Sequence, residues 1–150
     1  MVELLVVSAC LVGVNCKYNG GNNDNEKVKE FLKDKEYIII CPEQLGGLTT
    51  PRKPSEINCL DGRDVLYKNG KVISCENVDV TENFVNGANE SLKIAKMFNC
   101  DKALLKEGSP SCGCNLIYDG TFSGKKIPGK GVTAALFIEN NIEVFSEKEL

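Results

Sequence analysis

The chain has 150 residues, of which 42% are hydrophobic, 26% charged and 7% aromatic, a composition typical of a folded globular domain rather than of a disordered or coiled-coil chain. Its formal net charge is −3 and no basic run exceeds two residues, which argues against a nucleic acid polymer as partner. Histidine is absent, so every catalytic triad or zinc site that needs an imidazole is excluded. We expect one domain over residues 1–150.

The sequence carries no signal for a membrane or for secretion. No stretch approaches the roughly 20 consecutive apolar residues that cross a bilayer, so we expect no membrane partner. The first residues, Met1, Val2 and Glu3, include an acid where a secretory signal has Lys or Arg. We therefore expect a cytoplasmic protein, in whose reducing compartment structural disulfides are rare.

The first part of the chain predicts two strands separated by a helix. Residues 3–8 form an apolar run typical of a buried strand, and residues 26–34 carry apolar side chains at helical spacing. Residues 37–40 are aromatic and β-branched, which favours a second strand. This strand is expected to end at Cys41, because Pro42 cannot continue a central ladder.

Residues 46–75 have a different character and predict a β-hairpin excursion at the edge of the sheet. Two apolar stretches, 64–67 and 72–74, flank the pair Asn69 and Gly70. This dipeptide between apolar stretches is the strongest short-range signal for a hairpin.

The rest of the chain predicts a long helix, two strands and a shorter helix. Asp79 and Glu82 have the spacing of a capping box, and an apolar stripe of period 3.6 follows from Phe84 to Phe98. The other predicted elements are a strand over 103–106, a helix over 132–139 and a strand over 142–145. Because strands alternate with helices, we predict an α/β fold: a single compact Rossmann-like domain with a mainly parallel sheet.

Eight cysteines are an unusual number for a cytoplasmic protein. Packing as a small hydrophobe is the expected role of Cys59, Cys75 and Cys100. Cys10, Cys41 and Cys112 differ, because each follows one of the predicted strands. The carboxyl ends of parallel strands meet at one edge of the sheet, where ligands bind. We therefore expect these three residues to form a three-thiolate site at that edge.

Three thiolates fit an iron–sulfur cluster better than zinc. Structural zinc usually has four ligands, commonly from Cys-x-x-Cys knuckles, and the chain has no such pair. A four-iron cluster on three cysteines leaves one iron open, and an open metal position can act as a Lewis acid on a substrate. Cys16 and Cys114 are left open as a fourth ligand that would close the site.

Polar residues accompany these thiols. Glu43 lies two residues after Cys41, and Ser109 lies shortly before Cys112. In a chain without histidine, Glu43 is the preferred candidate for a general base, the alternative being a loop glutamate in solvent. Arg52 lies between two prolines and is interpreted as a surface charge, with a guanidinium held over the crevice as the alternative.

A glycine-rich string over residues 129–134 fits the pattern G-x-G-x-x-G/A of dinucleotide-binding sites. It follows a loop rather than a strand, so its context does not meet the requirement of that motif. We interpret the string as helix packing or a general anion site.

Short motifs surround each of the candidate residues. They are Val7-Ser8-Ala9-Cys10-Leu11, Cys41-Pro42-Glu43, Thr50-Pro51-Arg52, Ser109-Pro110-Ser111-Cys112-Gly113, Ile117-Tyr118-Asp119-Gly120-Thr121-Phe122 and Gly129-Lys130-Gly131-Val132. Together they resemble a bacterial and archaeal family, long catalogued as a domain of unknown function, that includes the thiouracil desulfurases. The resemblance extends from Val7 to Ser146.

The resemblance implies a Rossmann-like domain with an oxygen-sensitive [4Fe-4S] cluster on Cys10, Cys41 and Cys112. It also implies non-redox removal of sulfur from a thiolated pyrimidine such as 2-thiouracil, with release of sulfide. In the mechanism that the resemblance implies, the thiocarbonyl sulfur binds the open iron. Water activated at Glu43, with Ser109 nearby, then attacks the carbon.

The leading hypothesis is therefore an iron–sulfur-dependent desulfurase whose partner is a small thiolated pyrimidine. The alternative is a non-catalytic metal-binding module, with zinc or a closed iron–sulfur cluster, or a redox-sensing module. In that alternative, four or more thiols close the site and no position stays open for a substrate.

Overall fold

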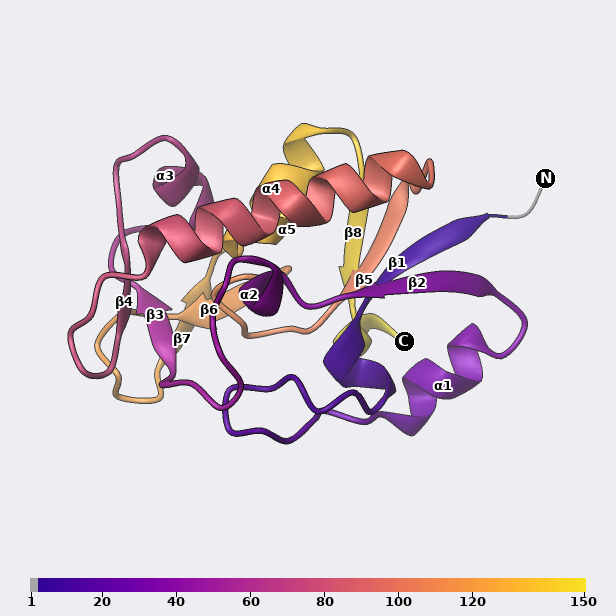
Figure 1. Cartoon of the computed structure of the whole chain (residues 1–150), viewed down its shortest axis with the longest axis horizontal. Helices are drawn as coiled ribbons and strands as arrows, with labels where there is room; N and C mark the ends of the chain where they lie inside the picture. The colour runs from indigo at the N-terminus through magenta and orange to yellow at the C-terminus, as the bar shows by residue number, and fades with distance from the viewer. Residues whose placement is uncertain (1–2) are drawn as a thin grey trace.

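Four parallel strands form the central sheet (Figure 1) in a computed structural model that describes residues 3–150. In sheet order they are β2 (Glu36–Ile40), β1 (Leu4–Ser8), β5 (Lys102–Leu105) and β8 (Glu143–Ser146). β1 pairs with β2 and with β5, and β5 pairs with β8, all in parallel. Strands buried on both faces have unbroken apolar sequences. The predicted α/β fold with a mainly parallel sheet is confirmed.

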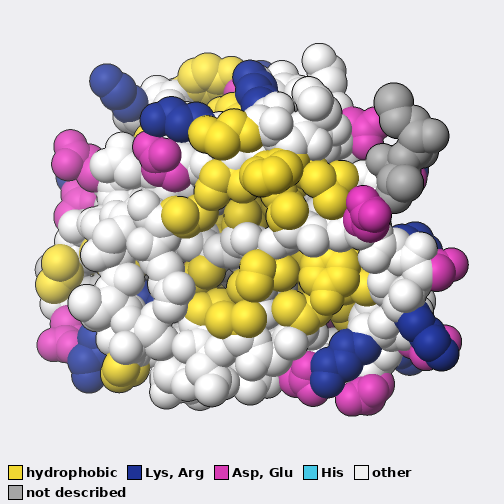
Figure 2. Space-filling model, turned by 45° about the vertical axis from the view of Figure 1, so that its right-hand side comes forward, with side chains coloured by type: hydrophobic (Ala, Val, Ile, Leu, Met, Phe, Trp, Pro, Cys, Tyr) yellow, Lys and Arg dark blue, Asp and Glu magenta, His cyan; other side chains and the backbone are white. Residues whose placement is uncertain are grey.

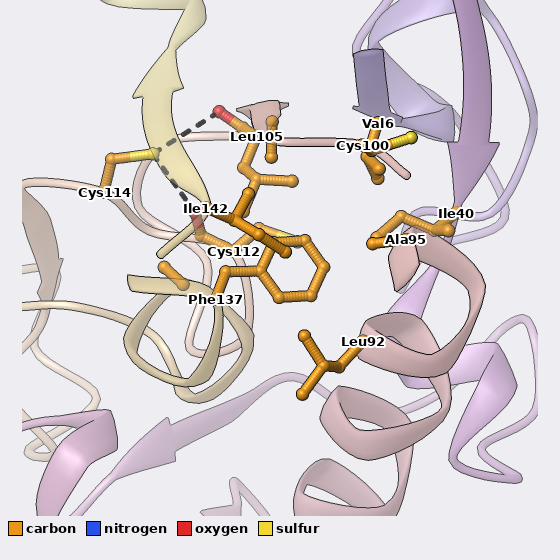
Figure 3. Packing of buried hydrophobic residues seen from close by; sticks show 12 residues of the cluster. Val6, Ile40, Leu92, Ala95, Cys100, Leu105, Cys112, Cys114, Phe137 and Ile142 are labelled. Atoms are coloured by element: carbon orange, nitrogen blue, oxygen red, sulfur yellow. Dashed lines mark hydrogen bonds between the residues drawn. The ribbon is translucent and has the colours of Figure 1, made fainter. Parts of the chain in front are cut away.

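Helices cover both faces of this sheet. α1 (Glu26–Leu32) lies on one face, where its Val28 joins an apolar cluster with side chains of β1 and β5. α4 (Thr81–Met97) and α5 (Val132–Glu139) cover the other face. Phe137 of α5 lies in the cluster of that face, which Figure 3 shows from close by.

The long helix α4 has the predicted apolar stripe with two differences at its ends. The buried members of the stripe are Phe84, Ala88, Leu92 and Ala95. Phe98, which was expected to extend it, follows the last helical residue and is 51% exposed. Asp79 accepts a hydrogen bond from the N–H of Thr81 (2.9 Å), but the N-cap residue is Val80. The predicted capping box between Asp79 and Glu82 is therefore wrong.

Two antiparallel strand pairs form an excursion beside the sheet. They are β3 (Ser55–Ile57) with β4 (Val72–Ser74), and β6 (Leu116–Tyr118) with β7 (Lys126–Pro128). The hairpin predicted over residues 64–74 is wrong in its first strand, because a helix, α3 (Gly62–Leu66), occupies that position. The cause is a capping box: Asp61 accepts from the N–H of Arg63 (3.0 Å), and Asp64 accepts from the N–H of Asp61 (2.9 Å).

Three short helices begin at or near strand ends. They are η1 (Ala9–Val12), α2 (Pro42–Leu45) and η2 (Glu147–Glu149). α2 packs across α4. This contact matters for the site, because α2 starts directly after Cys41.

The surface carries an apolar face where the edge strand β2 and the C-terminal end of α4 meet (Figure 2). Among the exposed large apolar side chains, Tyr37 and Ile39 belong to β2, and Met97 and Phe98 lie at the C-terminal end of α4. Within residues 3–150, the structure contains no helix with the length and apolar character needed to cross a membrane.

Candidate active site

A cavity of about 400 Å³ opens beyond the carboxyl ends of β1, β2 and β5. Cys10 lies in η1 directly after β1, Cys41 directly follows β2, and Cys112 lies in the loop between β5 and β6 (residues 106–115, the Cys112 loop). All three line the cavity, and so do Glu43 and Ser109. The structure thus brings five residues singled out from the sequence to one place.

Cys16 lines the same cavity, next to Cys10 and Cys41. The Cys16 thiol lies within hydrogen-bonding reach of both sulfur atoms, and its single S–H can bond to either of them. These contacts lower the pKa of Cys10 and, against the opposing effect of burial, lower the pKa of Cys41 to about 7. The same two contacts raise the pKa of Cys16. Cys10 and Cys41 are therefore the thiols that ionise readily, as metal ligands must.

Cys112 is buried, and its burial raises the pKa of its thiol. The negative charges of Glu43, Cys10 and Cys41 raise it further, so these groups lie within electrostatic reach of one another. Within the described part of the chain, no three Cys, Asp or Glu side chains approach closely enough to hold a single metal ion. A four-iron cluster is larger than one ion and is held by thiolates, so this donor set fits a cluster better than zinc.

Cys114 is not among the residues that line the cavity, and its side chain lies in the hydrophobic cluster drawn in Figure 3. Its Sγ donates to the carbonyl oxygens of Leu105, at 3.9 Å, and Cys112, at 3.6 Å. Burial raises the pKa of this thiol, so Cys114 belongs to the core and is not placed to bind a metal in the cavity. Among the cysteines expected in the core, Cys100 is buried, but Cys75 is exposed and the expectation is wrong for it.

Glu43, in the first turn of α2, forms a partly buried ion pair with Arg52. Oε2 of Glu43 lies 3.0 Å from Nη2 of Arg52, and the two side chains are 17% and 9% exposed. The same Nη2 donates to the carbonyl oxygen of Cys16 at 2.9 Å. The interpretation of Arg52 as a surface charge is therefore wrong. Its guanidinium ties Glu43 to the chain segment that carries Cys16.

Ser109 begins the turn that presents Cys112. Its Oγ accepts hydrogen bonds from the backbone N–H groups of Ser111 (3.0 Å) and Cys112 (3.1 Å). These bonds use both acceptor positions of the hydroxyl oxygen and leave its O–H free to donate. Ser109 can therefore donate a hydrogen bond to a bound molecule but has no free lone pair to accept a proton.

The glycine-rich string before α5 supports the Cys112 loop instead of a dinucleotide. The N–H groups of Val132 and Thr133 donate to the carbonyl oxygens of Pro110 and Ser111, both at 2.8 Å. A side chain on Gly131 would overlap the Ser111 carbonyl group. The helix packing interpretation of this string is thus the one that the geometry supports, because the first N–H groups of α5 are already bonded.

Further residues complete the wall of the cavity, and no role was expected from the sequence for any of them. They are Tyr18, Lys53, Tyr118, Phe122 and Lys126. Aromatic rings can pack against a flat heterocycle, and lysines can attract an anion. These residues come from loops and a short hairpin, which have no periodic pattern that could have revealed them.

Comparison with known proteins agrees with this site. A model of the 2-thiouracil desulfurase family matches residues 5–149. The uncharacterized protein YbbK of Bacillus subtilis (strain 168) is 47% identical over 147 residues, which make up 98% of this chain and 97% of YbbK. The solved structure of the [4Fe-4S]-dependent thiouracil desulfidase TudS has a TM-score of 0.85 and 37% identity, and the match covers 99% of this chain and 93% of TudS. The chain therefore belongs to the 2-thiouracil desulfurase family.

Proposed function

We propose that this protein is a [4Fe-4S]-dependent desulfidase that removes sulfur, as sulfide, from a small thiolated pyrimidine such as 2-thiouracil. The observation that carries the proposal is the convergence of Cys10, Cys41 and Cys112 on one cavity with Glu43 and Ser109. Membership of the 2-thiouracil desulfurase family and the likeness to TudS support it.

The three cavity thiols are the residues that hold the cluster in this proposal. Cys10, Cys41 and Cys112 offer soft sulfur donors from three separate segments, and soft thiolates select iron–sulfur clusters. When bound, the cluster supplies an open iron that acts as a Lewis acid on the thiocarbonyl group. Cys16 lines the same cavity, and in this proposal it supports these ligands rather than adding a fourth.

Glu43 is the general base of the proposed reaction. Arg52 engages its Oε2 at 3.0 Å, which fixes the carboxylate and leaves Oε1 to accept a proton from water. The reaction needs no redox step: water adds to the thiocarbonyl carbon, the carbon–sulfur bond breaks, and the products are the oxo compound and sulfide. A base held within reach of the attacking water contributes about 10²–10⁴-fold to such a step.

Ser109 and the aromatic wall orient the substrate. The free O–H of Ser109 donates to a ring or exocyclic acceptor of the heterocycle, since its oxygen already accepts two backbone N–H groups. Tyr118 and Phe122 line the same cavity and provide faces against which a flat ring packs.

Anaerobic reconstitution with iron and sulfide, followed by incubation with 2-thiouracil, tests this function. We expect uracil and sulfide to form in equal amounts, without added reductant and only in the reconstituted protein. The chain offers a matched pair of variants, Cys112→Ser on the cavity and Cys114→Ser outside it. The first should lose the cluster and the activity, and the second should keep both. A brown reconstituted protein that leaves 2-thiouracil and 4-thiouracil unchanged would contradict the proposal.

A closed metal-binding or redox-sensing module is the second candidate, and one observation favours it. Cys16 lines the cavity next to Cys10 and Cys41. In this second candidate, Cys16 supplies a fourth thiolate that coordinates the remaining iron. In that case substitution of Cys16 destroys the cluster. With an open site, Cys16→Ser retains four irons per chain and the activity.

A further inference from the structure

A buried carboxylate, that of Glu107, holds the two ends of the Cys112 loop together. Glu107 follows β5 by two positions and is 6% exposed. Its Oε1 accepts hydrogen bonds from three consecutive backbone N–H groups at the far end of the loop: Cys114 at 2.8 Å, Asn115 at 2.9 Å and Leu116 at 3.0 Å. Its Oε2 accepts from the side-chain amide of Asn115 at 3.1 Å.

Successive N–H groups that converge on one point form a concave anion site. In this protein the chain's own carboxylate occupies that site, so Glu107 is satisfied in a place where an unpaired carboxylate would be costly. Burial raises the pKa of Glu107, but the bonds from Asn115, Leu116 and Cys114 outweigh it and the pKa is lowered. Glu107 is therefore ionised at neutral pH, and charge-assisted hydrogen bonds are about twice as strong as neutral ones.

These contacts hold the backbone N–H groups on the exit side of the Cys112 loop. The start of α5 holds the carbonyl groups of Pro110 and Ser111, and Ser109 holds the N–H groups of Ser111 and Cys112. The segment after Cys112 returns to β6 over the Glu107 carboxylate. The carbonyl oxygens of this segment are held by other groups, namely the N–H groups of Gly129 and Gly131 and the Nζ of Lys130, whereas Glu107 holds its consecutive N–H groups.

We propose, on the basis of the proposed function, that Glu107 is a positioning residue. Its carboxylate fixes the exit of the Cys112 loop, so that the Cys112 thiol faces the cavity in the geometry that retains the cluster. Glu107 itself neither binds iron nor transfers a proton in this account. It acts through the backbone that carries Cys112.

The test uses the full chain with Glu107→Gln and Glu107→Ala, and Glu56→Gln as the matched control. Glu56 is also a buried glutamate, 9% exposed, whose Oε1 accepts two backbone N–H groups, from Gly120 (2.9 Å) and Phe122 (3.2 Å), in the β6–β7 turn. Glutamine keeps the shape and one acceptor oxygen of Glu107 but loses its charge and brings two amide groups face to face at Asn115. Alanine removes every bond.

Two measurements separate positioning from general destabilisation. The first is amide hydrogen exchange of the cluster-free chain by NMR. Exchange at Cys114, Asn115 and Leu116 should accelerate about tenfold in Glu107→Gln, as expected for the loss of roughly one net hydrogen bond, and more in Glu107→Ala. Glu56→Gln should accelerate exchange only at Gly120 and Phe122. The second is iron loss from the reconstituted protein to a chelator, followed by visible absorbance, which should be faster in both Glu107 variants and unchanged in Glu56→Gln.

Each outcome decides for or against the proposal. The proposal is supported if the Glu107 variants accelerate amide exchange only at the three loop amides and also lose iron faster than the wild type. Unchanged exchange there, acceleration spread over the whole chain, or equal iron loss in Glu107→Gln and Glu56→Gln overturns it. If the wild-type chain binds no cluster at all, the proposed function fails, whereas the exchange measurement still shows whether Glu107 fixes the loop.

Discussion

Gly87 of α4 marks the place where α2 packs closest to that helix. A Cβ built on Gly87 would overlap the Pro42 carbonyl oxygen and lie 2.9 Å from its carbon, whereas carbon atoms in contact normally lie about 3.5–4.0 Å apart. Gly87→Ala therefore forces α2 away from α4. Forcing an extra methyl group into a packed interior costs about 1–3 kcal/mol, and the backbone oxygen of Pro42 cannot rotate out of the way.

The sign of the change makes Gly87→Ala a sharp test. In an unconstrained helix, replacing glycine by alanine stabilises by about 1 kcal/mol, so we expect a net loss of up to about 2 kcal/mol in the free energy of unfolding. Urea titration of the full chain under anaerobic, reducing conditions measures it, with the exposed neighbour Asn86→Ala as the control that should lose nothing. Because Glu43 lies on α2, the variant should also lose desulfidase activity. A Gly87→Ala protein more stable than the wild type would refute the close approach of the two helices.

Three further predictions concern the cavity and the Cys112 loop. Glu43→Gln should keep the cluster absorbance but lower kcat by about 10²–10⁴-fold and lower the stability, because Arg52 loses its charged partner, and an unchanged kcat would remove Glu43 as the base. Arg52→Lys keeps the charge without the planar fork, so kcat should fall by up to about 10²-fold through misplacement of Glu43, and steady-state kinetics beside Arg52→Gln would show whether charge alone suffices. The lowered pKa of Glu107 predicts that the stability difference between wild type and Glu107→Gln is fully present above pH about 4.3, the ordinary glutamate value, and is lost as the pH falls through the lower folded-state pKa. Urea titrations of both proteins at several pH values test this. The neighbouring charged residues Lys106, Glu147 and Glu149 are identical in both proteins, so their titration affects both alike. A stability difference that persists at the lowest pH would contradict the prediction.

The parallel sheet could be predicted from the sequence because its central strands β1 and β5 are buried on both faces, although the edge strand β2 is largely exposed. A continuous apolar run such as Leu4–Ser8 has few other stable environments. α3 could not be predicted in the same way, since its five residues are too short for a periodic pattern and the Asn69–Gly70 pair suggested a hairpin. The capping box at Asp61 and Asp64 was the local signal that could have revealed it.

The three cavity cysteines could be predicted because the topology of a parallel sheet, rather than any one side chain, gathers the ends of its strands. Arg52 could not be predicted, since its partners Glu43 and Cys16 lie 9 and 36 residues away along the chain. Only the folded loops bring them together. Glu107 was missed for another reason: a carboxylate that binds consecutive backbone N–H groups leaves no signature in residue type or spacing.

In the proposed function, Cys10, Cys41 and Cys112 alone hold a four-iron cluster. The most direct measurement is the iron content and visible spectrum of anaerobically reconstituted single Cys→Ser variants of these residues and of Cys16 and Cys114. We expect each of the first three variants to lose the brown cluster, and the variants of Cys16 and Cys114 to retain four irons per chain. Retention of a four-iron cluster by the Cys10, Cys41 or Cys112 variant, or its loss in Cys16→Ser, would contradict the account.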